Sequence, residues 1–177
     1  RVAIVQARMG STRLPGKVLT DIEGKPMLQR VIERLQRCES LDEIVVATTT
    51  RPEDFQLVRL AEKLGVRGFC GSDDDVLHRY VTAARHFSAD VVVRVTGDCP
   101  LIDPEVVDRV TWALKNDVDY ASNIEWRSFP KGLDVEAFHM DALERADRMA
   151  YTPEAREHVT TFIRDDQWSR FVRKDVR

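Results

Sequence analysis

Short runs of apolar, β-branched residues alternate along the chain with longer segments in which apolar residues recur every three or four positions. The short runs predict buried strands over residues 2–7, 43–48, 66–70, 90–96 and 118–121. The longer segments predict helices over residues 26–37, 52–64, 73–87 and 104–114. Strand and helix in this alternation indicate an α/β domain whose sheet is mostly parallel and covered by helices on both faces.

The alternation ends near residue 122. After a loop-like stretch, a period-two pattern predicts a strand over residues 133–139. The remaining segments predict two helices and a last strand, over residues 141–150, 153–164 and 168–172. We expect one domain over residues 1–177, in which residues 122–165 form a lid or a dimer arm.

The predicted sheet indicates where a ligand binds. Ligands of open α/β sheets lie beyond the carboxyl ends of the strands. The loops of interest therefore follow Ala7, Thr48, Cys70 and Thr96.

Composition narrows the classes of function. The 177 residues are 43% hydrophobic and 32% charged, which is enough apolar material for a globular core. The net charge of −3 argues against nucleic-acid binding, and no apolar run approaches the roughly 18 residues of a membrane span. Three cysteines without a C-x-x-C pair predict neither a disulfide framework nor a zinc site, and they fit a cytoplasmic protein.

Positive charge is concentrated at the start of the chain. Residues 1–20 contain no acidic side chain and four cationic ones: Arg1, Arg8, Arg13 and Lys17. A loop rich in Gly and Ser offers free backbone N–H groups, and Arg and Lys add donors for phosphate oxygens. The segment over residues 7–17 therefore suits a polyphosphate, although a surface turn with solvated charges is the alternative.

The basic loop does not match the common phosphate-binding motifs. Five residues separate Gly10 from Gly16, and Val18 follows the lysine, whereas a Walker loop has four residues and then Lys followed by Ser or Thr. A G-x-G-x-x-G dinucleotide fingerprint is also missing from the sequence.

Carboxylates follow later strands. Asp98 comes directly after the strand over residues 90–96 and is a candidate Mg²⁺ ligand, because Mg²⁺ takes one or two carboxylates together with phosphate oxygens and water. A turn cap next to Gly97 is the alternative reading. Alternation places Asp134 and Glu136 on one face of a strand, as a second acidic group or as a solvated edge.

Three segments together resemble one family. They are residues 8–17 (RMGSTRLPGK), 97–103 (GDCPLID) and 132–136 (GLDVE). They resemble the sugar cytidylyltransferases of the CMP-Kdo synthetase and acylneuraminate cytidylyltransferase type, and most closely the SpsF-like spore-coat polysaccharide biosynthesis proteins. The resemblance extends from residue 2 to about residue 165.

This resemblance implies a three-layer α/β/α, Rossmann-like fold of the nucleotide-diphospho-sugar transferase type. It also implies transfer of CMP from CTP to an acidic sugar or sugar phosphate, with release of pyrophosphate, for surface polysaccharide biosynthesis. The implied catalytic residues are Arg8, Arg13, Lys17 and Asp98, with Mg²⁺ on Asp98 and Asp134. The implied nucleotide contacts add Ala7, Gly10, Ser11, Gly71, Ser72 and Thr96.

The chain departs from the family pattern in two ways. Thr96 stands where members often have Gln, which leaves the preferred base open, and the chain is shorter than typical members, so part of a C-terminal portion is expected to be missing. A sugar-binding lid over residues 122–165 is expected to use Trp126, Lys131, Glu136 and His158. A helix-packing role is the alternative for His158, and a homodimer is a further expectation.

Other functions stay open on the sequence alone. A nucleotidyltransferase that uses another nucleoside triphosphate is the first alternative. A glycosyltransferase is the second, because residues 73–75 match D-x-D by their letters, although a helix start also explains three acids there. A non-catalytic binding module is the third.

Overall fold

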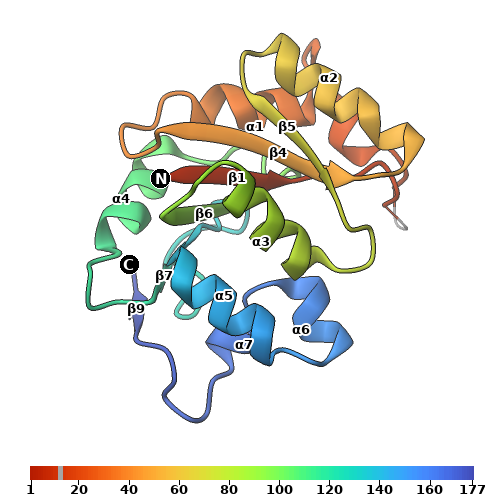
Figure 1. Ribbon diagram of the computed structural model, residues 1–177. Coiled ribbons are helices and arrows are strands. Elements are labelled where there is room, and N and C mark those ends of the chain that lie inside the picture. Colours follow the sequence, from red (N-terminus) through yellow and green to blue (C-terminus); the bar gives the residue numbers. More distant parts are fainter. Residues whose placement is uncertain (12–13) are drawn as a thin grey trace.

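The computed structural model describes residues 1–11 and 14–177, and it contains one seven-stranded sheet (Figure 1). The order of the strands is β5-β4-β1-β6-β8-β7-β9. β8 is antiparallel to β6 and β7, whereas β5, β4, β1 and β6 are parallel and β9 is parallel to β7. The strands are β1 (Val2–Gln6), β4 (Glu43–Thr49), β5 (Arg67–Gly71), β6 (Val91–Thr96), β7 (Tyr120–Ser122), β8 (Glu136–His139) and β9 (Arg173–Asp175).

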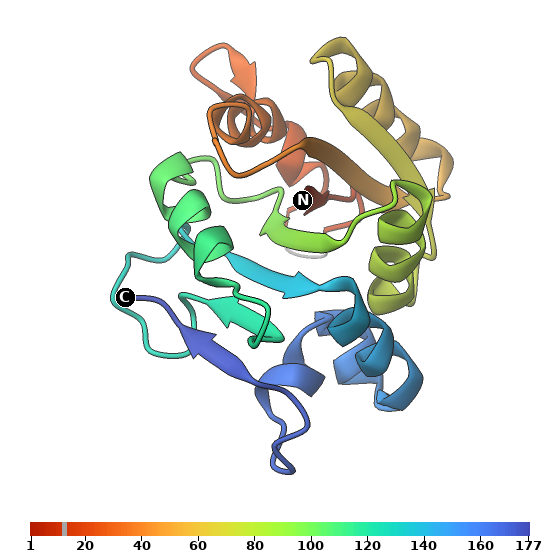
Figure 2. The same ribbon diagram turned by 60° about the vertical axis from the view of Figure 1, so that its left-hand side comes forward.

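Helices cover both faces of this sheet, which confirms the predicted three-layer α/β/α architecture (Figures 1 and 2). The helices are α1 (Met27–Leu35), α2 (Phe55–Lys63), α3 (Val76–His86), α4 (Pro104–Ala113), α5 (Met140–Met149), α6 (Pro153–His158) and α7 (Thr161–Arg164). Two 3₁₀ turns, Lys17–Leu19 and Pro52–Asp54, and a small hairpin of β2 (Asp21–Ile22) and β3 (Lys25–Pro26) complete the described elements.

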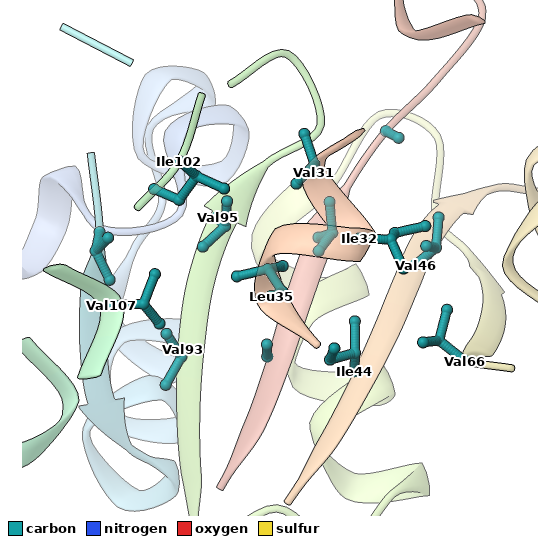
Figure 3. Packing of buried hydrophobic residues seen from close by; sticks show 14 of the residues in the cluster. Val31, Ile32, Leu35, Ile44, Val46, Val66, Val93, Val95, Ile102 and Val107 are labelled. Carbon is teal, nitrogen blue, oxygen red and sulfur yellow. The ribbon is translucent and has the colours of Figure 1, made fainter. Parts of the chain in front are cut away.

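The alternation of side chains along each strand divides the core into two clusters. Ala3 and Val5 of β1 pack with α1, α2 and α4, and Val31, Ile32 and Leu35 of α1 lie over Val46 and Val93 of the sheet (Figure 3). The intervening residues Val2 and Ile4 pack on the other face with α3, α5, α6 and α7. Since the central strands are buried on both faces, their carboxyl ends are held rigidly beneath the loops that follow them.

Most predicted elements agree with the structure to within a few residues, but four differ. The strand predicted over residues 133–139 begins at Glu136, so Asp134 lies in the preceding loop. The helix predicted over residues 153–164 is two helices, and the strand predicted over residues 168–172 is displaced to Arg173–Asp175. The β2–β3 hairpin was not predicted, since its two-residue strands are too short to produce a periodic pattern.

Residues 122–165 contribute to the same sheet. β8 pairs with β6, and α5 and α6 pack against α3. In the part of the chain that the structure describes, no helix has the length and apolar character needed to cross a membrane.

Candidate active site

The loops that follow β1 and β6 meet at one edge of the sheet. The two strands are parallel neighbours, and Gln6 is paired with Thr96 at their carboxyl ends. A cavity of about 420 Å³ lies there. Five of the predicted nucleotide-binding residues line it, together with the predicted metal ligand Asp98: Ala7, Arg8, Ser11, Lys17 and Thr96.

Lys17 and Asp98 form a direct ion pair at this cavity, although 81 positions separate them in the sequence. The Lys17 Nζ donates to Asp98 Oδ2 at 2.8 Å, and the two side chains are 36% and 42% exposed. Partial burial opposes ionisation of Asp98, but the hydrogen bond from Lys17 holds the pKa of that carboxyl below its ordinary value. The predicted meeting of the basic loop with the acidic loop is confirmed.

The basic loop is fixed to the body of the protein by Asp54. This carboxylate is buried, and it accepts hydrogen bonds from the Met9 N–H at 2.7 Å and from the Thr49 hydroxyl. The loop closes on itself where the Gly16 N–H donates to the Met9 carbonyl at 2.9 Å. Gly16 has a φ of 72°, which a residue with a Cβ adopts only with strain. Sequence analysis did not find Asp54, because nothing near it in the chain marks it as a loop anchor.

Gly97 lets the acidic loop pass close to β1. A Cβ at this position would lie 3.1 Å from the Gln6 carbonyl oxygen and 3.1 Å from Ala7 Cβ. The Gly97 N–H donates to the same carbonyl at 2.9 Å. A larger side chain would therefore push Asp98 away from the basic loop.

The second candidate metal ligand, Asp134, lies outside the lining of the cavity. Its two carboxylate oxygens accept from the Arg127 guanidinium at 2.8 and 3.0 Å. Burial raises the pKa of the Cys99 thiol, and the charges of Asp98 and Asp134 add to that effect. The structure brings Lys17 and Asp98 into contact, whereas the contacts of Asp134 among the described residues are with Arg127.

Glu136 does not share an exposed face with Asp134, which corrects the expectation from alternation. Its side chain is 3% exposed, and the carboxylate accepts from Arg94, from the Thr160 hydroxyl and from the Tyr120 hydroxyl at 2.6 Å. Burial opposes ionisation, but Arg94 and the two hydroxyls hold the pKa of Glu136 below its ordinary value. The physical reason for the error is that strand pairing begins only at Glu136, so the period-two pattern does not extend back to Asp134.

The remaining predicted residues are distributed as follows. His158, at the end of α6, lines the cavity. The Ser72 hydroxyl accepts a hydrogen bond from the Asp75 N–H at 3.1 Å. Ser72, Gly10 and Gly71 are not among the residues that line the cavity. Trp126 and Lys131 are exposed in the loop before β8, and neither is among the residues that line the cavity. Arg13 lies outside the described residues.

Two of the three acidic residues over positions 73–75 form contacts within the protein. Asp75 caps α3 through the His78 N–H at 2.8 Å and binds the Arg156 guanidinium, while Asp73 pairs with Arg51. The helix-start interpretation of this run is confirmed.

Three polar residues that sequence analysis missed also line the cavity: Gln6, Arg79 and Glu157. Gln6 is the last residue of β1, and Arg79 projects from α3. Arg79 interrupts an otherwise apolar buried face formed by Val76, Tyr80 and Ala83. A lone cation within such a face is the signal that could have identified it.

A second hollow, of about 780 Å³, opens at the amino ends of β4 and β5 between Glu43, Arg67 and His86. It is at the opposite end of the strands from the Lys17–Asp98 pair. Because ligands of parallel sheets bind at the carboxyl ends, the smaller cavity is the candidate active site.

Comparison with known proteins agrees with this geometry. Residues 2–175 match the cytidylyltransferase family. The chain belongs to this family. It is 35% identical to the spore coat polysaccharide biosynthesis protein SpsF of Bacillus subtilis. The match extends over 170 residues and covers 92% of this chain and 69% of SpsF.

Solved structures of cytidylyltransferases share the fold. A cytidylyltransferase from Leptospira borgpetersenii superposes with a TM-score of 0.94 at 34% identity, over 99% of this chain and 75% of that one. The CMP:2-keto-3-deoxy-manno-octonic acid synthetase complexed with CTP has a TM-score of 0.78 at 22% identity, over 99% and 88% of the two chains. The chain spans about two thirds of the length of the curated relatives that it matches over most of its residues.

Proposed function

We propose that this protein transfers CMP from CTP to a sugar and releases pyrophosphate. The observation that supports this most is the ion pair of Lys17 and Asp98, which joins the basic loop after β1 to the acidic loop after β6 at one cavity. A polyphosphate and a divalent cation need cations and carboxylates side by side, and few other ligands need both.

Mg²⁺ suits the residues at this edge. Asp98 and Asp134 offer hard carboxylate oxygens, both are partly exposed, and each is neutralised by a flexible cation, Lys17 or Arg127, that can turn away. Asp98 would hold the ion, with Asp134 as the second candidate. A bound Mg²⁺ would neutralise phosphate oxygens and lower the pKa of a coordinated hydroxyl.

The reaction forms one bond and breaks another at the α-phosphorus of CTP. A hydroxyl or phosphate oxygen of the sugar attacks, the bond from the α-phosphorus to the bridging oxygen breaks, and pyrophosphate leaves with the electron pair. Where a hydroxyl attacks, the proton that it releases is taken up by the departing pyrophosphate or by water. Arg8, Arg13 and Lys17 would bind the β- and γ-phosphates and stabilise the charge that develops on them. Ser11 and the loop N–H groups would orient the triphosphate, so positioning and electrostatics carry the catalysis.

The relatives support a sugar acceptor and the base cytosine. The Leptospira protein is a cytidylyltransferase, and SpsF is a spore coat polysaccharide biosynthesis protein. The glycosyltransferase alternative loses its main support, because Asp73 and Asp75 are engaged by Arg51 and Arg156. We therefore propose that the protein makes an activated sugar for a surface polysaccharide.

A product assay tests this proposal. The protein is incubated with each of the common nucleoside triphosphates, Mg²⁺ and a pool of acidic and phosphorylated sugars, and pyrophosphate and new products are followed by mass spectrometry. We expect pyrophosphate release with CTP and a CMP-sugar as the product. Hydrolysis of a nucleotide sugar would instead support a glycosyltransferase, and lack of any Mg²⁺-dependent nucleotide binding would support a non-catalytic module.

A further inference from the structure

Arg79 is a buried guanidinium that lines the cavity. It is 2% exposed, and its Nε has no hydrogen-bond partner among residues 1–11 and 14–177. Its stem lies directly over Gly71, where a Cβ would meet Arg79 Cγ at 2.8 Å. The side chain is therefore held against β5 on one side and reaches the cavity on the other.

The charge of Arg79 is poorly compensated by its surroundings. Burial lowers the pKa of its guanidinium, and the neighbouring charge of Arg8 lowers it further. Tyr80, Asp73 and Asp54 act in the opposite direction, but Asp73 already pairs with Arg51 and Asp54 with the basic loop. A buried, unpaired charge is costly to a fold, so its presence beside a cavity calls for a ligand.

Gln6 presents a further donor to the same cavity. Its Oε1 accepts from the Arg94 guanidinium at 3.1 Å. Because arginine has donors and no acceptor, this contact fixes which end of the amide is the oxygen. The amide NH₂ of Gln6 is therefore free to donate a hydrogen bond to a ligand in the cavity that Gln6 lines.

We infer that Arg79, together with Arg8 and the Gln6 amide, forms a subsite of hydrogen-bond donors that binds a phosphate or carboxylate group of a substrate, in a cavity whose lining also holds the carboxylates Asp98 and Glu157. This inference rests on the proposed function. It adds Arg79 to the loop cations and Asp98 as a residue that contacts a substrate. A phosphate of the nucleotide and an acidic group of the acceptor sugar share this chemistry. Arginine suits both, since its planar fork binds two oxygens at once.

If Arg79 binds a ligand, replacing it should weaken binding of that ligand without destabilising the ligand-free protein. Arg79→Met keeps an apolar stem over Gly71 and removes the buried charge, so the ligand-free variant should melt at a higher temperature than the wild type. An arginine that served only to hold the fold together would give a lower melting temperature. Arg79→Lys keeps the charge but loses the fork, and it provides a second variant if the first does not fold.

The experiment is calorimetric titration of wild type, Arg79→Met and Arg79→Lys with CTP, CMP, cytidine and inorganic phosphate in the presence of Mg²⁺. Arg85→Met is the matched control, because Arg85 is on the same helix but pairs with Glu144 at the surface. We expect Arg79→Met to weaken CTP binding about tenfold to a hundredfold, the range for a lost charged hydrogen bond, and Arg85→Met to have no effect.

The pattern of losses identifies the source of the anion. Weaker binding of CTP and CMP with unchanged binding of cytidine assigns the subsite to a nucleotide phosphate. Unchanged nucleotide binding with a raised KM for the acceptor found in the product assay, at constant kcat, assigns it to the acidic group of that sugar.

The inference is overturned if Arg79→Met leaves all of these affinities and the acceptor KM within about twofold of wild type. Failure of the wild type to bind CTP would count against the proposed function instead, and the titration with inorganic phosphate would then test the subsite alone.

Discussion

At the scale of single residues, the proposed function depends most on the ion pair of Lys17 and Asp98. Both side chains are more than a third exposed, so their attraction is screened by solvent and contributes little to the stability of the fold. The same exposure leaves both groups accessible to a ligand. Each partner neutralises the other, and we propose that a triphosphate takes the place of Asp98 beside Lys17 and a cation the place of Lys17 beside Asp98.

Asp98→Asn should abolish turnover and leave the fold intact. Removing the carboxylate should cost about 3 kcal/mol or more of transition-state stabilisation, measured as single-turnover CMP transfer, while the melting temperature changes little. Asp141→Asn is the control, since Asp141 also forms an ion pair at the surface, with Arg145 of α5. Near-normal turnover of Asp98→Asn would remove the catalytic role of this residue.

Glu136→Gln should destabilise the protein by about 3 kcal/mol near neutral pH, because it breaks a buried ion pair with Arg94. The pKa of Glu136 is lowered in the folded state, so its contribution is complete above the ordinary value of 4.5 and is lost as the pH falls through the folded-state pKa. The difference in unfolding free energy between wild type and variant should therefore shrink in acid.

Urea unfolding at a series of pH values from neutral to acid measures this difference. Glu62→Gln is the control, because Glu62 is exposed on α2 and should give a small difference at every pH. If the difference in unfolding free energy between wild type and Glu136→Gln stayed constant down to about pH 3, Glu136 would not be an ionised, buried partner of Arg94.

The charged residues of the two loops could be identified from the sequence, whereas the polar residues around them in the cavity could not. Lys17 and Asp98 follow strands that are easily predicted, so topology alone brings them to one edge. Arg79 and Gln6 lie within a helix and a strand, where a polar residue among apolar ones has several explanations. Their roles become visible only when burial and hydrogen-bond partners are known.

At the scale of elements, the basic loop depends on its backbone conformation. Gly16 has a φ of 72°, and its N–H closes the loop onto Met9. A Cβ there would also lie 3.3 Å from the Met9 side chain. The loop therefore presents its donors only if this residue adopts the left-handed region.

Gly16→Ala should destabilise the fold by about 1 kcal/mol and should also weaken CTP binding, because the loop that presents Lys17 is distorted. Gly24→Ala is a close control. Gly24 has a φ of 80° in the β2–β3 turn, with open space around a Cβ, so the backbone strain is similar but lies outside the cavity. Thermal melting and calorimetry compare the two, and equal CTP affinity in both variants would contradict the role of the loop.

The junction between α6 and α7 shows what periodicity cannot reveal. Val159 is fully buried at a φ of 60° and a ψ of −58°, and the Thr160 N–H donates to the His158 carbonyl at 2.6 Å across it. This is a γ-turn in a strained conformation, which persists because the packing around Val159 holds it. The turn ends the helix that carries His158 to the cavity and places the Thr160 hydroxyl on Glu136.

At the scale of the whole molecule, the fold places one site over the middle of the sheet. β1 and β6 are central, and the loops that follow them, from distant parts of the chain, meet at their carboxyl ends. The alternation of strands and helices predicted this arrangement up to β6. It did not predict that β8 would insert antiparallel beside β6, because strand direction depends on pairing between distant segments.

The most direct measurement is the Mg²⁺ dependence of CTP binding in wild type, Lys17→Met and Asp98→Asn, determined by calorimetry with and without Mg²⁺. We expect Mg²⁺ to tighten CTP binding to the wild type, Asp98→Asn to lose this dependence, and Lys17→Met to bind CTP more weakly in both conditions. CTP affinity that is the same in all of these proteins, whether or not Mg²⁺ is added, would contradict the claim that the two loops bind one nucleotide.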